Sequence, residues 1–166
     1  RRVAAEAGMA LSNVQHYYQS KDLLVEALLL YTMDVFQSKM DAIAASMTDS
    51  SRTERFLSTI DMFLDEITDP VTHAIFFEIW ALASRHEFAS QLMDKMMGRE
   101  RKAIYNLIRG LNPAISDADY MRRAVLMVAQ VEGLMLFRLN RAARREQFLE
   151  VRAGVRRLLL NLATVP

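Results

Sequence analysis

Residues 3–24, VAAEAGMALSNVQHYYQSKDLL, decide how the chain begins to fold. We expect a short helix over residues 3–7 and a second over about residues 10–17, with Gly8 between them where a left-handed turn residue is needed. Two short helices joined by a glycine-containing turn are typical of a helix-turn-helix, whose second helix enters a DNA major groove about 12 Å wide. The segment therefore predicts a DNA-binding motif.

The second short helix has an apolar and a polar face. Leu11, Val14 and Tyr18 are spaced three and four residues apart, so we expect them to face inward. The opposite face then carries Ser12, Asn13, Gln15 and His16. Asn and Gln pair bidentately with adenine, and Ser and His reach phosphates or base edges. The alternative interpretation is a generic helical hairpin whose polar side chains merely face water.

These residues resemble the second half of the DNA-binding domain of the tetracycline-repressor (TetR) family. The resemblance rests on the Ala7-Gly8 turn, on His16-Tyr17-Tyr18, and on Ser20-Lys21-Asp22 before a run of leucines. Tyr18 stands where phenylalanine is usual, and Gln15 stands where many members have tyrosine, which alters what that face reads. The first helix of that domain is absent, and the chain starts at Arg1 without a methionine, so we expect the natural protein to begin earlier.

The resemblance implies a role for each polar residue of this segment. Ser12, Asn13 and Gln15 would face base edges, while His16, Tyr17 and Lys21 would hold phosphates. It also implies a DNA-binding part at residues 1–21 and an effector-binding and dimerisation domain at residues 22–166. The implied protein is a ligand-responsive regulator, most simply a repressor released from its double-stranded DNA operator by a small molecule. A helical ligand-binding or adaptor bundle without DNA binding is the alternative.

The rest of the chain has helical periodicity throughout, which predicts an all-α bundle. A single stripe contains Phe56, Leu57, Ile60, Phe63, Leu64 and Ile67. Asp69-Pro70 predicts a helix start, and the following helix, to about Arg85, is apolar nearly all round, so we expect it in the middle of the core. Ser116 and Asp119 resemble a capping box before a mostly apolar helix from Tyr120 to Leu139, which Gln130 and Glu132 interrupt.

The last helix, about Arg145 to Ala163, carries a heptad pattern that calls for a partner helix. We therefore expect a homodimer in which this helix and its predecessor pair with their symmetry mates. Gly133, unfavourable inside a helix, would permit close approach of the two copies. The predicted interface comprises Gly133, Phe148, Val151, Val155, Leu158 and Leu162.

Soft and aromatic side chains on the middle helices are candidates for an effector cavity. They are Phe63, Phe76, Phe77, Trp80, Met93, Met97, Tyr105 and Met127. Taken one by one, each is more simply explained as packed core. Glu78 and Gln130 interrupt apolar surfaces and are the candidates for orienting a ligand, although either can equally be paired structurally or exposed.

Composition excludes several other classes of protein. The 166 residues include no cysteine, so there is neither a disulfide scaffold nor a thiolate metal site. Charges interrupt every apolar run, so we expect no membrane span and a cytoplasmic protein. No phosphate loop or di-iron motif is present, and we expect no enzyme activity, metal or cofactor. Asp69 and His73 have metal-ligand spacing, but a hydrogen-bonded histidine is the simpler interpretation.

Charge is divided unevenly along the chain. Residues 1–21 carry a net charge of +2, residues 22–115 carry −5, and residues 116–166 carry +4. A basic end joined to an acidic middle suits a protein that contacts a polyanion at one end, although an ordinary solvated surface explains the same numbers.

Overall fold

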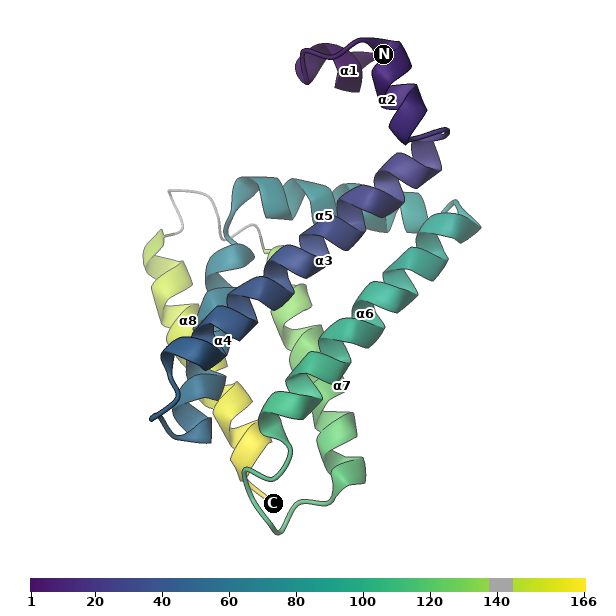
Figure 1. Cartoon of the computed structure of the whole chain (residues 1–166). Coiled ribbons are helices and arrows are strands. Elements are labelled where there is room, and N and C mark those ends of the chain that lie inside the picture. The colour runs from purple at the N-terminus through teal and green to yellow at the C-terminus, as the bar shows by residue number, and fades with distance from the viewer. Residues whose placement is uncertain (138–144) are drawn as a thin grey trace. The chain divides into compact units, whose positions relative to one another are not determined.

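The computed structural model describes residues 1–137 and 145–166. The regular elements in these two ranges are all α-helices, which confirms the expected all-α fold class (Figure 1). They are α1 (Arg2–Glu6), α2 (Leu11–Tyr17), α3 (Lys21–Ser46), α4 (Arg52–Glu66), α5 (Pro70–Ala83), α6 (Glu87–Ile108), α7 (Asp117–Met135) and α8 (Arg145–Thr164). The chain divides into two compact units, Arg1–Lys39 and Met40–Pro166, so the dividing point falls inside α3.

In the first unit, α1 and α2 are joined by a tight turn around Gly8. The φ angle of Gly8 is +62°, which confirms the expected left-handed residue. The backbone N–H of Met9 donates to the carbonyl of Ala4 at 2.9 Å and closes the turn. After α2, the side chain of Ser20 accepts a hydrogen bond from the backbone N–H of Leu23 at 3.1 Å, which starts α3.

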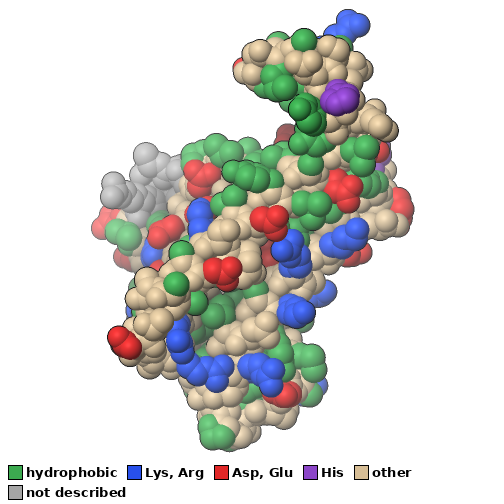
Figure 2. Space-filling view, viewed as in Figure 1, with side chains coloured by type: hydrophobic (Ala, Val, Ile, Leu, Met, Phe, Trp, Pro, Cys, Tyr) green, Lys and Arg blue, Asp and Glu red, His purple; other side chains and the backbone are tan. Residues whose placement is uncertain are grey.

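Hydrophobic side chains reach the surface of this first unit (Figure 2). Val3 is 56% exposed and Tyr17 is 72% exposed, whereas Ala4 is buried. Leu29 and Met33 are the buried residues of α3. Apolar side chains of both α1 and α2 are therefore exposed.

The core of the second unit is built on the apolar stripe of α4. Phe56, Ile60 and Leu64 are completely buried, which confirms the predicted stripe. Their helix begins at Ser51, whose side chain accepts from the backbone N–H of Glu54 while the Glu54 carboxylate accepts from the backbone N–H of Ser51. This capping box satisfies backbone donors that the first turn leaves unpaired.

Helices α6 and α7 pack against each other as antiparallel neighbours, α5 packs on α6, and α8 packs on α4 and α7 (Figure 1). The turn between α6 and α7 is held by Tyr120, whose buried hydroxyl donates to the carbonyl of Asn112 at 2.9 Å. The Asn112 side-chain amide donates in turn to the carbonyl of Thr164 at 2.7 Å. One polar cluster thus ties the α6–α7 turn to the end of α8.

The expectation that the helix after Pro70 lies in the middle of the core is wrong. Only Phe76 and Ile79 of α5 are buried, while Val71 and Trp80 are 66% and 51% exposed. The reason is that α5 packs mainly on α6, so only the side chains on that face are fully buried. The predicted start of α5 is confirmed, because Asp69 accepts from the backbone N–H of Thr72 at 2.8 Å and Pro70 occupies the first turn.

The C-terminal helix buries one residue of the predicted heptad within the chain and leaves another exposed. Val155, Leu159 and Ala163 are buried within the chain, whereas Leu158 is 43% exposed. Before it, α7 begins as expected, with the Ser116 side chain accepting from the backbone N–H of Asp119 at 3.1 Å, and ends at Met135. Leu139, the predicted end of that helix, lies outside the described residues.

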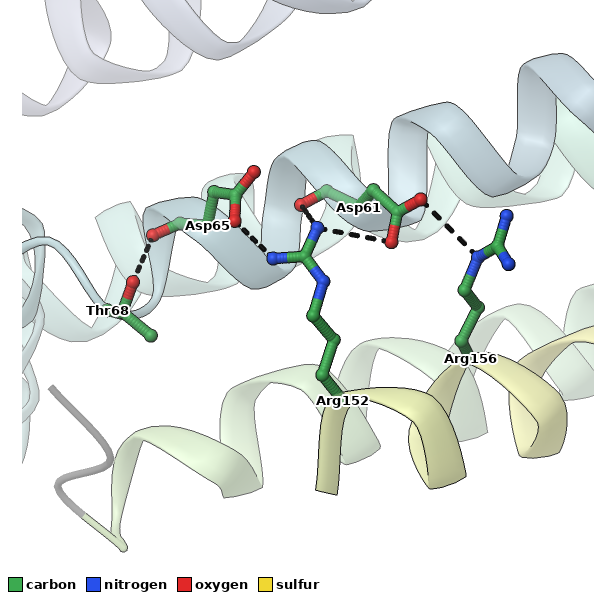
Figure 3. A network of polar contacts seen from close by, with 5 residues as sticks. All are labelled: Asp61, Asp65, Thr68, Arg152 and Arg156. Carbon is green, nitrogen blue, oxygen red and sulfur yellow. Dashed lines mark hydrogen bonds and ion pairs between the residues drawn. The ribbon is translucent and has the colours of Figure 1, made fainter. Parts of the chain in front are cut away.

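An ionic network joins α4 to α8 (Figure 3). The Arg152 guanidinium contacts the carboxylates of Asp61, at 3.2 Å, and Asp65, and Arg156 lies 3.3 Å from the other Asp61 oxygen. The Asp65 contact is the main cause of a raised Arg152 pKa. Arg152 is mostly buried and Arg156 is about half exposed, so the inner arginine is the better screened from water.

Candidate functional site

Helix α2 presents its polar side chains to solvent. Ser12, Asn13, Gln15, His16 and Tyr17 are all exposed, and Lys21 at the start of α3 is exposed as well. Leu11, Val14 and Tyr18 are half-buried on the other face, as the spacing predicts. The His16 and Tyr17 rings stack edge to face with centroids 5.4 Å apart. All six predicted DNA-contacting residues therefore lie on the open surface of the first unit, which is the condition for reading a groove.

A cavity of about 460 Å³ lies between α5, α6 and α7 in the second unit. Its lining is mostly apolar and aromatic, and its volume falls in the usual range for small-molecule sites. The lining residues are Phe76, Phe77, Trp80, Met97, Arg101, Val125, Val128, Ala129, Glu132, Gly133, Met135 and Leu136. Trp80, Phe77 and Leu136 are open to solvent at the surface, whereas Phe76 and Met135 are buried.

Four of the predicted effector residues line this cavity: Phe76, Phe77, Trp80 and Met97. The other six lie outside its lining. Met93 and Met127 are buried in the core, Phe63 is half-buried on α4, and the Tyr105 ring is covered by the guanidinium of Arg109 at 5.4 Å. The two predicted orienting groups, Glu78 and Gln130, are both exposed.

The polar group that does line the cavity is Glu132 of α7. Its carboxyl forms a hydrogen bond with the carboxyl of Glu100 on α6, and both residues are partly buried. Burial raises the pKa of Glu132 to about 8, and the charge of Glu100 adds to the shift. Burial also raises the pKa of Glu100 to about 7. A carboxyl pair in apolar surroundings holds a shared proton because the two charges repel each other.

The sequence contains a signal for Glu132 that is ambiguous by itself. Gln130 and Glu132 both interrupt the apolar pattern of α7 and lie about 200° apart around the helix. One of the two therefore faces solvent when the other faces α6. Arg101, the second charged lining residue, has an exposed side chain whose guanidinium lies near Gly98 of its own helix.

His73 takes the structural role that the sequence favoured. Its Nε2 atom lies 3.2 Å from the carbonyl of Met135, and its ring lies 4.6 Å from the ring of Phe77. Asp69, its partner in the predicted metal-ligand spacing, instead caps α5. Across residues 1–137 and 145–166 the structure brings together no group of three or more metal-ligating side chains.

A second hollow, of about 560 Å³, lies between α4 and α8. Asp61, Arg152 and Arg156, which line it, are joined in the network of Figure 3, and Arg157 lines it as well. Its lining is more polar than that of the cavity beside α5, whose mostly apolar and aromatic lining is typical of small-molecule sites.

The predicted dimer residues are spread over different environments. Gly133 lines the cavity, where a Cβ would meet no other atom within 4 Å, and Val155 is buried within the chain. Phe148, Val151 and Leu162 are half-buried, and Leu158 is exposed. Further exposed apolar side chains on α7 and α8 are Met121, Val125, Leu126 and Leu149.

The part of the chain that holds the cavity also matches a known family. Residues 52–163 match the family model of the BetI-type transcriptional repressor C-terminal domain. No curated protein and no solved structure matches the chain. In the described ranges, no helix has the length and apolar character needed to cross a membrane. The match spans most of the chain, including every residue that lines the cavity, and the chain therefore belongs to the TetR family of transcriptional regulators, with a BetI-type repressor C-terminal domain.

Proposed function

We propose that this regulator binds operator DNA as a homodimer through α2 and is released when a small molecule enters the cavity between α5, α6 and α7. The observation that carries the proposal is the exposed polar face of α2 in a chain whose C-terminal region is of a repressor type. Such a protein acts by binding and not by catalysis.

The side chains of α2 are suited to two kinds of DNA contact, one to bases and one to phosphates. Asn13 and Gln15 are amides able to pair bidentately with adenine, and Ser12 lies beside them on the exposed face. His16, Tyr17 and Lys21 are suited to phosphate oxygens, which position the protein without reading sequence.

Exposed apolar side chains on the last two helices support dimer formation. Leu126 on α7 and Leu149 and Leu158 on α8 are between 43% and 58% exposed. A second copy would remove this apolar surface from water. A dimer would also present two copies of α2, and paired recognition helices read half-sites separated by about 34 Å or a multiple of it.

The continuous helix α3 supports coupling between the two functions. It runs from Lys21 through the dividing point of the two compact units to Ser46, so this helix contributes residues to both units. A shift of this helix on effector binding would change the separation of the two α2 helices, and a mismatch with the half-sites would weaken binding.

Selection from a pool of random DNA duplexes tests this function in the full-length protein. We expect enrichment of a pseudo-palindromic sequence, and we expect Asn13→Ala with Gln15→Ala to abolish it. Gln91→Ala with Asn106→Ala, the same pair of amide losses on the exposed surface of α6, is the matched control. If the unmodified protein enriches no sequence, the chain is a ligand-binding or adaptor bundle and the proposal is wrong.

A further inference from the structure

The cavity between α5, α6 and α7 has one partly buried acidic group in a mostly apolar wall. Phe76, Phe77 and Trp80 of α5 supply aromatic surface, while Glu132 of α7 supplies the carboxyl. Glu132 is partly buried, whereas Arg101 keeps its charge in an exposed side chain. The apolar surroundings therefore destabilise the charged form of Glu132 more than that of Arg101.

The titratable partner that raises the pKa of Glu132 is another acid. Glu100 of α6 is hydrogen-bonded to it and raises the cost of ionising it. Two facing carboxylates repel each other, so the pair retains a proton unless a cation is placed beside it. The pair is thus a site for a hydrogen-bond donor that also brings positive charge.

We propose that the effector is a lipophilic amine, whose protonated nitrogen donates a hydrogen bond to Glu132 while its hydrocarbon part packs against Phe76, Phe77 and Trp80. This assignment rests on the proposed function, because it names the ligand class of the same cavity. The proton shared with Glu132 then resides on Glu100, which donates to the Glu132 carboxylate. Glu100 is a positioning residue, since it does not line the cavity.

The hydrogen bond separates amines from quaternary ammonium ions. A quaternary ammonium brings the same charge and can contact the aromatic rings, but it has no N–H that could donate a hydrogen bond to Glu132. A neutral alcohol of the same shape can donate a hydrogen bond but brings no charge. Charge-assisted hydrogen bonds are about twice as strong as neutral ones, so the amine is expected to bind most tightly.

Fluorescence of Trp80 gives a direct readout of occupancy, because it is the single tryptophan of the chain and lines the cavity. The probes are 1-adamantylmethylamine, its N,N,N-trimethyl derivative and 1-adamantylmethanol, which share one hydrocarbon cage and do not absorb with tryptophan. At pH 7.5 we expect the amine to bind at least about tenfold more tightly than the alcohol, and several-fold more tightly than the quaternary ion.

Two variants test whether Glu132 causes the tighter binding of the charged probe. Glu132→Gln should reduce the affinity for the amine to about that for the alcohol and leave the alcohol unchanged. Glu150→Gln, the same charge loss at an exposed position of α8, should leave the ratio of the two affinities as in the unmodified protein. Thermal unfolding establishes that both variants are folded. The comparison of the three probes on the unmodified protein tests the proposal even if a variant does not fold.

Different outcomes contradict different parts of the argument. Equal affinities of amine and alcohol, or an amine preference that survives Glu132→Gln, overturn the amine assignment and leave the cavity as an effector site. A quaternary ion that binds as tightly as the amine overturns the hydrogen bond to Glu132. If no probe changes the fluorescence at millimolar concentration, the cavity is not an effector site for molecules of this size, and both proposals about it are wrong.

Discussion

The carboxyl groups of Glu100 on α6 and Glu132 on α7 form a hydrogen bond across the contact between these two helices. Both groups titrate well above the range of an exposed glutamate, with pKa values raised to about 7 and about 8, mainly because burial disfavours their charged forms. The folded chain therefore holds protons at neutral pH that the unfolded chain releases.

This pair makes the stability of the fold depend on pH. Between about pH 5 and pH 8 the folded state binds more protons than the unfolded state, so the free energy of unfolding falls as pH rises. Glu132→Gln keeps a hydrogen-bond donor and removes one charge, so we expect it to stabilise the chain by on the order of 1 kcal/mol at pH 8 and by little at pH 5. Urea unfolding at both pH values measures the difference. A stabilisation that is the same at both values would contradict the shared proton.

The same ionisation predicts how amine binding changes with pH. Glu132 must be charged to hold an ammonium group, so we expect 1-adamantylmethylamine to bind about tenfold more tightly at pH 8.5 than at pH 6, while remaining protonated as alkylamines do. The alcohol probe corrects for the other ionisable and charged groups around the cavity, which include His73 of α5 and Glu100 and Arg101 of α6. Parallel pH profiles for the two probes would contradict this expectation.

The two arginines that face Asp61 should differ in their contribution to stability. Arg152 is mostly buried and bridges Asp61 and Asp65, so Arg152→Ala should lower the free energy of unfolding by about 1–3 kcal/mol. Arg156 is half exposed, and Arg156→Ala should cost about 0–1 kcal/mol because water screens its ion pair. Chemical unfolding of the two variants side by side measures this. Equal losses would mean that burial does not strengthen the ion pairs of Arg152 relative to that of Arg156 in the network of Figure 3.

Gln15 and Lys21 should affect DNA binding in different ways. For the selected operator, Gln15→Ala should cost about 1–3 kcal/mol and relax the preference at one position of each half-site. Lys21→Ala should weaken binding to all duplexes alike and reduce the slope of log affinity against log salt by about one per subunit. Titrations at several salt concentrations, with operator and scrambled duplexes, separate the two effects. Identical salt slopes for both variants would show that the assignment of bases and phosphates is wrong.

The oligomeric state should depend on exposed apolar side chains of α7 and α8. We expect Leu126→Glu with Leu158→Glu to convert dimers to monomers, because both side chains are exposed in the single chain and a buried charge is costly at an interface. Val155 is unsuitable for this test because it is buried within the chain, where a charge would unfold it. Light scattering gives the mass, and Val71→Glu on exposed α5 is the control. A monomer for the unmodified protein would contradict the homodimer.

The fold class and many helix starts follow from local sequence. The Gly8 turn, the Asp69-Pro70 start of α5 and the Ser116 cap of α7 each depend on residues within a few positions, so backbone preferences and short-range hydrogen bonds specify them. The buried stripe of α4 also follows from its spacing. Exposure of Trp80 does not, because a helix that is apolar nearly all round has no continuous polar face to show which side its neighbours leave open.

The sequence by itself determined that the chain is helical, where most helices begin, and that α2 has an amide-rich face. Only the tertiary structure decided that Glu132, and not Gln130 or Glu78, meets the cavity, and that Val155 packs inside the chain while Leu158 does not. The physical reason is that helical periodicity fixes the angles between side chains on one helix but not the direction of the helix as a whole. That direction depends on which neighbouring helix buries which stripe, and those contacts join residues far apart in the chain.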